Sequence, residues 1–227
     1  MERHLLDLEL NELKNDLIQM AHLSETAIGH AIRALLVRDL ELAETVLRGD
    51  DAINHLELAV DERCLRALAL YQPEAGDLRF IAMALKINND LERIGDQAVN
   101  IAERAVELMK EPPLEPLIDI PRMAELVQMM LTQSVDAFVQ RNTELARAVC
   151  ARDDQIDALD DQIFRGLLAY MFEDHAAISR AVQLILVSRH LERVADHATN
   201  IAEDVIYLAD GRQVKHRSAL AGNLADG

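Results

Sequence analysis

Acidic residues four positions apart occur at four places in this sequence where their spacing could support metal binding. Residues 91–103 (LERIGDQAVNIAE) recur 100 positions later as residues 191–203 (LERVADHATNIAE), with nine of the thirteen positions identical. Each copy contains one acidic pair, and another pair lies 35 residues before it. Residues four apart lie on the same side of a helix, so each pair brings two carboxylates together. The four pairs are Glu57–Asp61, Glu92–Asp96, Asp157–Asp161 and Glu192–Asp196.

The energetic cost of these pairs indicates that they bind a cation. Like charges at this spacing destabilise a helix by about 0.2–0.5 kcal/mol per pair. Two carboxylates about 6 Å apart repel by about 3 kcal/mol at an effective dielectric constant of about 20. Cations that prefer oxygen ligands would offset this repulsion, and iron, manganese, magnesium and calcium all fit such a site. Weaker candidate ligands in the repeated segments are Asn100, Glu103, Asn200 and Glu203.

An alternative interpretation is that the four acidic pairs bind no metal. They could form a solvated face, or pair with Arg93 and Arg193 in salt bridges. A carboxylate di-iron protein is disfavoured, because that chemistry needs Glu-x-x-His pairs in a bundle core, and none of the eight histidines follows a glutamate by three residues. His190 and His197 are interpreted as polar contacts, although His197 could support a ligand. The sequence contains no Ser/His/Asp arrangement or phosphate-binding loop, so we predict no enzyme.

The repeated segments belong to helices with a regular apolar seam. Apolar residues follow each other at alternating spacings of four and three, which predicts shallow packing against neighbouring helices. With the seam in the core, the acids are expected on the outside of each bundle. The seam residues are Ile87, Leu91, Ile94, Ala98, Ile101, Ala105 and Leu108 in the first half, and Val187, Leu191, Val194, Ala198, Ile201, Val205 and Leu208 in the second.

Prolines and turn residues divide the chain into two halves of three helices each. Four of the five prolines lie within residues 112–121, where no helix can continue. We place helix breaks at residues 49–51, at the Pro73 loop, at 152–154 and at 172–175. The predicted helices are 4–47, 51–70 and 75–109, then 120–150, 153–171 and 175–209. The first two helices of the halves align better at an offset of 103 residues, which pairs Arg38-Asp39 with Arg141-Asn142.

The sequence therefore predicts an all-α fold of two consecutive, internally repeated three-helix bundles, six helices in total. The predicted units are a first repeat at residues 1–111, a Pro-rich linker at 112–121, a second repeat at 122–212 and a C-terminal tail at 213–227.

Composition narrows the class of partner. The 227 residues carry a formal net charge of −17, which argues against binding nucleic acid or an anionic membrane surface and favours cations or a basic partner protein. Half of the residues are apolar but only 3% are aromatic, which suits packed helices. Cys64 and Cys150 form no C-x-x-C motif and are expected to be reduced core thiols, as in a cytosolic protein. We find no signal peptide and no apolar run of about 20 residues that could span a membrane.

The motifs resemble those of the PhoU family of phosphate-signalling proteins. The resemblance rests on Glu-Arg-Ile-Gly-Asp-x-Ala-x-Asn-Ile in the first half, on Glu-Arg-Val-Ala-Asp-His-Ala-Thr-Asn-Ile-Ala-Glu in the second, and on Gln-Pro-x-Ala-x-Asp-Leu-Arg at residues 72–79. It covers essentially the whole chain. Family members carry metal ions, including multinuclear iron clusters, on E(D)-x-x-x-D motifs, which correspond here to the four acidic pairs. The third motif begins with the shorter Asp157, and the second half lacks the Pro-x-Ala-x-Asp-Leu-Arg loop.

The resemblance implies a function in phosphate regulation. Such a protein would be a cytoplasmic, negative regulator of phosphate uptake and of the phosphate-starvation response. It would contact the ATPase of the phosphate ABC transporter and a sensor histidine kinase, and would reach the inner membrane only through these partners. Asp77 and Arg79 of the loop are the candidate partner-binding residues. Homodimerisation is expected from the resemblance, although no self-complementary patch in the sequence requires it. The alternative is a generic helical scaffold with solvated acidic faces.

Overall fold

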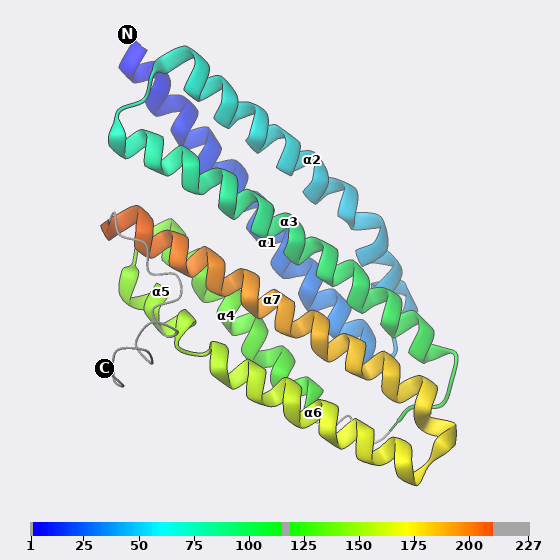
Figure 1. Cartoon of the computed structure of the whole chain (residues 1–227). Coiled ribbons are helices and arrows are strands. Elements are labelled where there is room, and N and C mark those ends of the chain that lie inside the picture. The colour runs from blue at the N-terminus through cyan, green and yellow to red at the C-terminus, as the bar shows by residue number, and fades with distance from the viewer. Residues whose placement is uncertain (1, 115–118, 211–227) are drawn as a thin grey trace, which may run out of the picture.

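The computed structural model describes residues 2–114 and 119–210, and within these ranges all regular structure is helical (Figure 1). The elements are α1 (Glu2–Val37), α2 (Leu40–Tyr71), α3 (Ala75–Met109), α4 (Ile120–Gln140), α5 (Thr143–Cys150), α6 (Asp153–Glu173), the short 3-10 helix η1 (His175–Ala177) and α7 (Ile178–Asp210).

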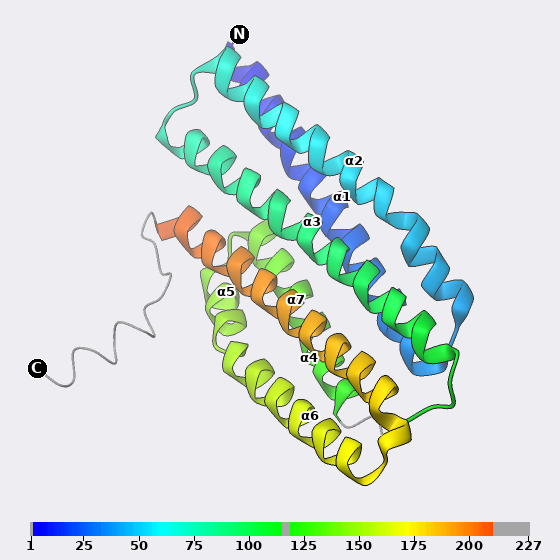
Figure 2. The ribbon, with the colours of Figure 1, turned by 45° about the vertical axis from the view of Figure 1, so that its right-hand side comes forward.

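The chain forms two three-helix bundles, as predicted, and the bundles lie side by side. The first contains α1, α2 and α3, and the second contains α4, α7 and the broken helix formed by α5 and α6, which takes the place of α2. The third helices of the two bundles, α3 and α7, run antiparallel next to each other at the centre of the molecule (Figures 1 and 2). The Pro-rich linker therefore joins two bundles that pack closely against each other.

The apolar seam forms the core of both bundles. All fourteen seam residues are buried except Leu208, which is half-buried at the end of α7. A second row of α3 side chains, which includes Lys86, Asp90 and Gln97, contacts α7 and was not identified from the sequence. Helix α3 is therefore buried on two sides, which leaves a narrow strip for the acids.

The first helix break lies eleven residues before the predicted one. The predicted break at residues 49–51 is wrong, because Gly49 lies within the continuous helix α2. The chain turns instead at Arg38, whose φ of 56° is left-handed, and Asp39 caps α2 by accepting a hydrogen bond from the Leu42 backbone nitrogen at 3.1 Å. The Arg38 guanidinium donates to the Met109 and Glu111 carbonyls at 3.0 and 2.6 Å, so it also satisfies the end of α3.

The second half repeats this turn 103 residues later. Arg141 has a φ of 52°, and Asn142 caps α5 by accepting hydrogen bonds from the Glu144 and Leu145 nitrogens at 3.1 Å each. The predicted helix 120–150 is therefore two helices. The predicted break at residues 152–154 does occur here, because α5 ends at Cys150 and α6 begins at Asp153.

Several sequence predictions concern the bundle boundaries. Of the predicted linker, 112–121, residues 112–114 and 119 are not helical, whereas Ile120 and Pro121 lie in the first turn of α4. Residues 115–118 and the tail at 213–227 lie outside the described residues.

Both cysteines are free thiols, and burial raises the pKa of Cys64 to about 12. None of the described helices is long and apolar enough to cross a membrane.

Candidate functional site

The first acidic cluster lies where α2 packs against α3. Glu92 of α3 is within electrostatic range of Asp96 on the same helix and of Asp50 and Glu57 on α2. Burial, followed by the charge of Asp96, raises the pKa of the Glu92 carboxyl; Arg93 opposes this shift, and Glu57 and Asp50 add to it. Asp50 was predicted to lie in a turn, and only the continuity of α2 places it beside this cluster. Acids of two helices therefore share one small region.

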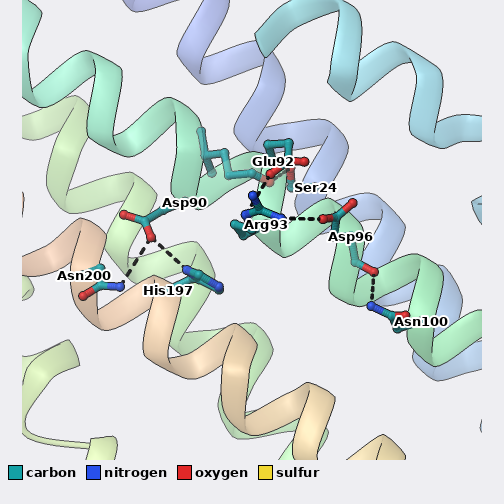
Figure 3. A network of polar contacts seen from close by, with 9 residues as sticks. Ser24, Asp90, Glu92, Arg93, Asp96, Asn100, His197 and Asn200 are labelled. Carbon is teal, nitrogen blue, oxygen red and sulfur yellow. Dashed lines mark hydrogen bonds and ion pairs between the residues drawn. The ribbon is translucent and has the colours of Figure 1, made fainter.

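Arg93 partly neutralises this cluster. Its guanidinium lies 3.3 Å from Glu92 Oε2 and 3.2 Å from Asp96 Oδ2 (Figure 3). The Arg93 side chain is half-exposed, whereas the Glu92 side chain is only 15% exposed. Glu92 Oε2 is buried and makes no hydrogen bond. Exposed arginine pairs contribute about 0–1 kcal/mol, so Arg93 does not fully offset the desolvation of Glu92, as the direction of its pKa shift also indicates.

Asp61 is held by a neighbour that the spacing of the acids does not reveal. The buried amide of Asn88 on α3 donates to Asp61 Oδ1 and to the Glu57 carbonyl, each at 3.0 Å. Asn88 Oδ1 is buried without a hydrogen-bond partner. Since Asn88 precedes Glu92 by one helical turn, Asp61 lies beside the cluster and its carboxylate is already engaged.

The second cluster lies between α6 and α7. Burial, followed by the charges of Asp153 and Asp157, raises the pKa of Asp196. The pKa of Glu192 is raised by burial, then by Asp196, Asp160 and Asp157. Burial also raises the pKa of Asp153, although Thr199 opposes the shift by donating a hydrogen bond at 3.2 Å. A hollow of ≈ 420 Å³ opens at this cluster beside Asp157 and Glu192.

Two consecutive aspartates of α6 have different environments. Asp160 is buried, accepts a hydrogen bond from Ser188 Oγ at 2.7 Å and lies 2.6 Å from the Arg189 guanidinium. Asp161, the residue proposed as a ligand, is 65% exposed and pairs with Arg165 at 3.1 Å. Asp161 borders the same hollow as Glu192, but Asp160, not Asp161, is among the charges that raise the pKa of Glu192. The i, i+4 spacing indicated Asp161, and Asp160 was missed for that reason.

The weaker candidates make other contacts. The Asn100 amide donates to the Asp96 carbonyl at 2.9 Å (Figure 3), and Glu103 pairs with Arg104 at 3.1 Å. Asn200 donates to Asp90 at 3.4 Å, and Glu203 contributes to the electrostatic environment of Cys150. None of these contacts directs the side chain to the carboxylates of its own cluster.

A polar contact between the bundles lies on the other side of α3. Buried Asp90 accepts a hydrogen bond from His197 Nδ1 at 2.8 Å, with the ring nitrogen protonated, and His190 Nδ1 lies 2.9 Å from Gln97 Oε1. Positions 90 and 97 are the counterparts of 190 and 197, so the two contacts are related by the duplication. Figure 3 shows Asp90 and Asp96 pointing in different directions from α3. His197 is therefore a bundle contact, as the sequence suggested.

The loop residues also have partners within the chain. Asp77 forms an ion pair with Arg3 of α1, and Arg79 Nη1 donates to the Leu208 carbonyl of α7 at 3.5 Å. Asp77 lies in the first turn of α3, whose N-cap residue is Glu74. Asp77 and Arg79 thus connect this part of the chain to α1 and α7. A partner protein that binds these two residues would therefore contact side chains that also take part in packing within the chain.

The donor chemistry of both clusters fits a hard cation, although the side chains are not converged on a common point. Within the described part of the chain, no three His, Cys, Asp or Glu side chains are arranged as a preformed metal site. Glu92 Oε2 is buried and has only the ion pair with Arg93, and the pKa values of Glu92, Glu192 and Asp196 are raised; a bound cation would relieve both conditions. Side-chain rotation could bring oxygen ligands of two helices to one ion in each cluster.

Comparison with known proteins identifies the family. A family model described as the PhoU domain matches residues 17–105 and again residues 120–205, which correspond to the two bundles. The chain belongs to the PhoU family. It is 51% identical, over 92% of its length and 95% of the relative, to a phosphate-specific transport system accessory protein PhoU homolog from Aquifex aeolicus.

Solved structures of PhoU proteins have the same fold. The crystal structure of PhoU from Pseudomonas aeruginosa matches with a TM-score of 0.89 at 40% identity, covering 91% of this chain and 99% of that one. The phosphate transport system regulatory protein PhoU from Streptococcus pneumoniae matches with a TM-score of 0.85 at 31% identity, covering 92% and 99%. The resemblance predicted from the motifs is confirmed.

Proposed function

We propose that this chain is a cytoplasmic, non-enzymatic regulator of phosphate transport that restrains phosphate uptake and the phosphate-starvation response. The observation that supports this most strongly is the family match over both bundles, together with the nearly full-length similarity to a phosphate-specific transport system accessory protein. The chain would act as an adaptor between the ATPase of the phosphate ABC transporter and a sensor histidine kinase. A homodimer is compatible with this role.

Metal binding is the second part of the proposal. In the first bundle Asp50, Glu57, Glu92 and Asp96 would hold the ions, with Asp61 joining after release from Asn88; in the second bundle Asp153, Asp157, Asp160, Glu192 and Asp196 would do so. The cation would supply positive charge that neutralises clustered carboxylates. The residues themselves connect α2 to α3 and α6 to α7, so ligation would stiffen each bundle. Iron, manganese, magnesium and calcium all suit these oxygen donors.

The runner-up is a helical scaffold whose acids are neutralised by arginine. The observation in its favour is the contact of Arg93 with both Glu92 and Asp96. In that case neither acidic cluster needs an ion, and chelation leaves the stability of the chain unchanged.

Expression of the chain in a bacterium that lacks its own PhoU protein tests the regulatory role. We expect phosphate uptake to fall and a phosphate-starvation promoter to be repressed, because the chain would restore restraint on the transporter and the kinase. Uptake of labelled phosphate and promoter activity are the two readouts. Folded chain at normal abundance with both readouts unchanged would contradict the proposal.

Replacing Arg79 by alanine tests the loop as a partner-binding element. We expect association with the transporter ATPase or the kinase to weaken at least about tenfold, since an arginine at an interface centre often contributes about 2 kcal/mol or more, while the helix content stays the same. A pull-down and circular dichroism measure these outcomes.

Arg104→Ala is the matched control, because Arg104 also connects α3 to α7, through Gln183 at 3.2 Å, but lies far from the loop. Equal loss of association in both variants, or none in Arg79→Ala, would show that the loop itself makes no specific contact with the partner.

A further inference from the structure

Six large apolar side chains are exposed on the pair formed by α6 and α7, and we call them the α6–α7 ladder. Three follow each other at four-residue spacing on α6 and three do so on α7. Their exposed fractions run from 36% to 74%, with Phe172 the most exposed. The ladder consists of Phe164, Leu168 and Phe172 on α6 and Ile178, Val182 and Leu186 on α7.

The register of the two helices places both rows on the solvent-facing part of the α6–α7 pair. Helices α6 and α7 are antiparallel neighbours joined by the turn at residues 174–177 (Figure 2). Asp160 contacts both Ser188 and Arg189, which sets their relative height. Phe164 follows Asp160 by one turn of α6, and Leu186 lies one turn before Arg189 on α7. The remaining members continue from there toward the turn, so the ladder is one continuous apolar strip.

The first bundle shows that the fold does not require this strip. At the offset of 100, Ile178, Val182 and Leu186 correspond to Leu78, Ala82 and Lys86. At the offset of 103, which pairs the buried residues Val60 with Ile163 and Cys64 with Leu167, the α6 row corresponds to Asp61, Leu65 and Ala69. The same helix pair therefore folds with two alanines, an aspartate and a lysine in place of large apolar groups. Exposed apolar strips that packing does not require mark interaction sites.

Acidic residues lie at both ends of the ladder. At one end are Asp157, Asp161 and Glu192, which outnumber Arg165, the arginine that pairs with Asp161; at the other are Glu173 and Asp174 near the connecting turn. A second copy of this chain would place acids against acids in either orientation, and the net charge of −17 adds to this repulsion. A partner with an apolar row and basic ends would be complementary in both charge and hydrophobicity.

We propose that the α6–α7 ladder binds an amphipathic helix of a partner protein, with its apolar side on the ladder and its basic residues over the acids at the two ends. From Asp157 to Phe172, α6 extends about 22 Å, the length of a helix of about 15 residues. Helices that bind apolar surfaces in this way present apolar residues at one-turn spacings. This proposal rests on the proposed adaptor function, for which it names a partner-binding surface.

A synthetic peptide tests the ladder directly. The probe is a fluorescent helix of leucine and lysine, about 18 residues or five turns long, with leucines on one side and lysines elsewhere; an isomer of identical composition but no apolar side is the reference. Fluorescence anisotropy is measured against the full chain. We expect the amphipathic peptide to bind at least about tenfold more tightly than its isomer, since apolar anchors dominate such interfaces.

The variant that tests the site carries Phe164→Gln, Phe172→Ala, Val182→Ala and Leu186→Gln, which leaves the net charge unchanged. We expect affinity for the amphipathic peptide to fall at least about tenfold. The matched control replaces the exposed leucines of α2, Leu40, Leu47, Leu58 and Leu65, by alanine, and should retain affinity. Circular dichroism verifies folding, and Phe172→Ala alone replaces the fourfold variant if that variant unfolds.

Three results would overturn this proposal. The two peptides could bind equally, which would mean attraction by charge alone. The ladder variant could keep full affinity. Sedimentation could instead show that the ladder variant converts a dimer into a monomer, which would assign the strip to a second copy. Phosphate uptake does not enter these measurements, so their failure leaves the regulatory role to be decided by the complementation experiment.

Discussion

Removing the carboxylates of Glu92 and Asp96 should eliminate about half of the metal bound by the purified chain. The double variant Glu92→Gln, Asp96→Asn loses the α3 half of the first cluster, while the second cluster remains complete. Because ions bind the folded state, saturation at about 100 times Kd stabilises it by about 2.7 kcal/mol for each site. The variant should therefore unfold at a lower temperature than the native chain when metal is present.

The order should reverse in the presence of a chelator. Without metal the native chain keeps the repulsion between Glu92, Asp96 and the acids of α2, which is reflected in the raised pKa of Glu92. The substitutions remove this repulsion and also the two contacts with Arg93, each worth about 0–1 kcal/mol because that arginine is half-exposed. The direction of the pKa shift shows that desolvation and repulsion outweigh Arg93, so the variant should be at least as stable.

Metal analysis and thermal unfolding, with and without chelator, provide the readouts. The corresponding change at Glu192 and Asp196 should remove the other half of the metal. A variant with Glu41→Gln and Glu44→Gln removes the same charge from exposed positions of α2 and should keep the full metal content. Unaltered metal content with a higher unfolding temperature in the Glu92/Asp96 variant would assign the acids to surface charge and favour the scaffold alternative.

Substituting Asp160 and its neighbour Asp161 separately should give very different stabilities. Asp160→Ala leaves the buried Ser188 hydroxyl with only the weak acceptor Met123 Sδ at 3.5 Å and removes the carboxylate that lies 2.6 Å from Arg189. Loss of the strong acceptor of a buried donor costs about 1–3 kcal/mol, which for a chain of this size lowers the unfolding temperature by several degrees. Asp161→Ala removes only an exposed pair with Arg165 and should change stability by less than about 0.5 kcal/mol.

Asp160→Asn separates the two interactions of Asp160, because the amide oxygen still accepts a hydrogen bond from Ser188 while the charge opposite Arg189 is lost. We expect it to be less destabilising than alanine. Chemical denaturation of the three variants decides the matter. If Asp160→Ala and Asp161→Ala lowered the stability equally, the orientation of α6 about its own axis, with Asp160 buried and Asp161 exposed, would be wrong.

The sequence alone determined the properties that depend on local periodicity. An apolar residue at every third or fourth position buries one side of a helix wherever the helix packs, so the repeat of residues 91–103 predicted both the bundles and their core. The same periodicity placed Glu92 beside Asp96 and Glu192 beside Asp196. The duplication also indicated that each half carries its own acidic cluster, because spacing within a helix does not depend on the rest of the chain.

The tertiary structure decided the features that depend on contacts between distant segments. Arg38 ends α1 and donates hydrogen bonds to the carbonyls at the end of α3, about seventy residues away. The chain therefore turns at Arg38 and not at Gly49. Because α2 continues through Gly49, Asp50 lies on this helix beside the cluster. The three-residue offset between α2 and α6 rotates α6, because each residue turns a helix by about 100°. That rotation buries Asp160 and exposes Asp161. The pairing of Asp90 with His197 likewise exists only because α3 and α7 pack antiparallel, a relationship between the two bundles that neither repeat encodes by itself.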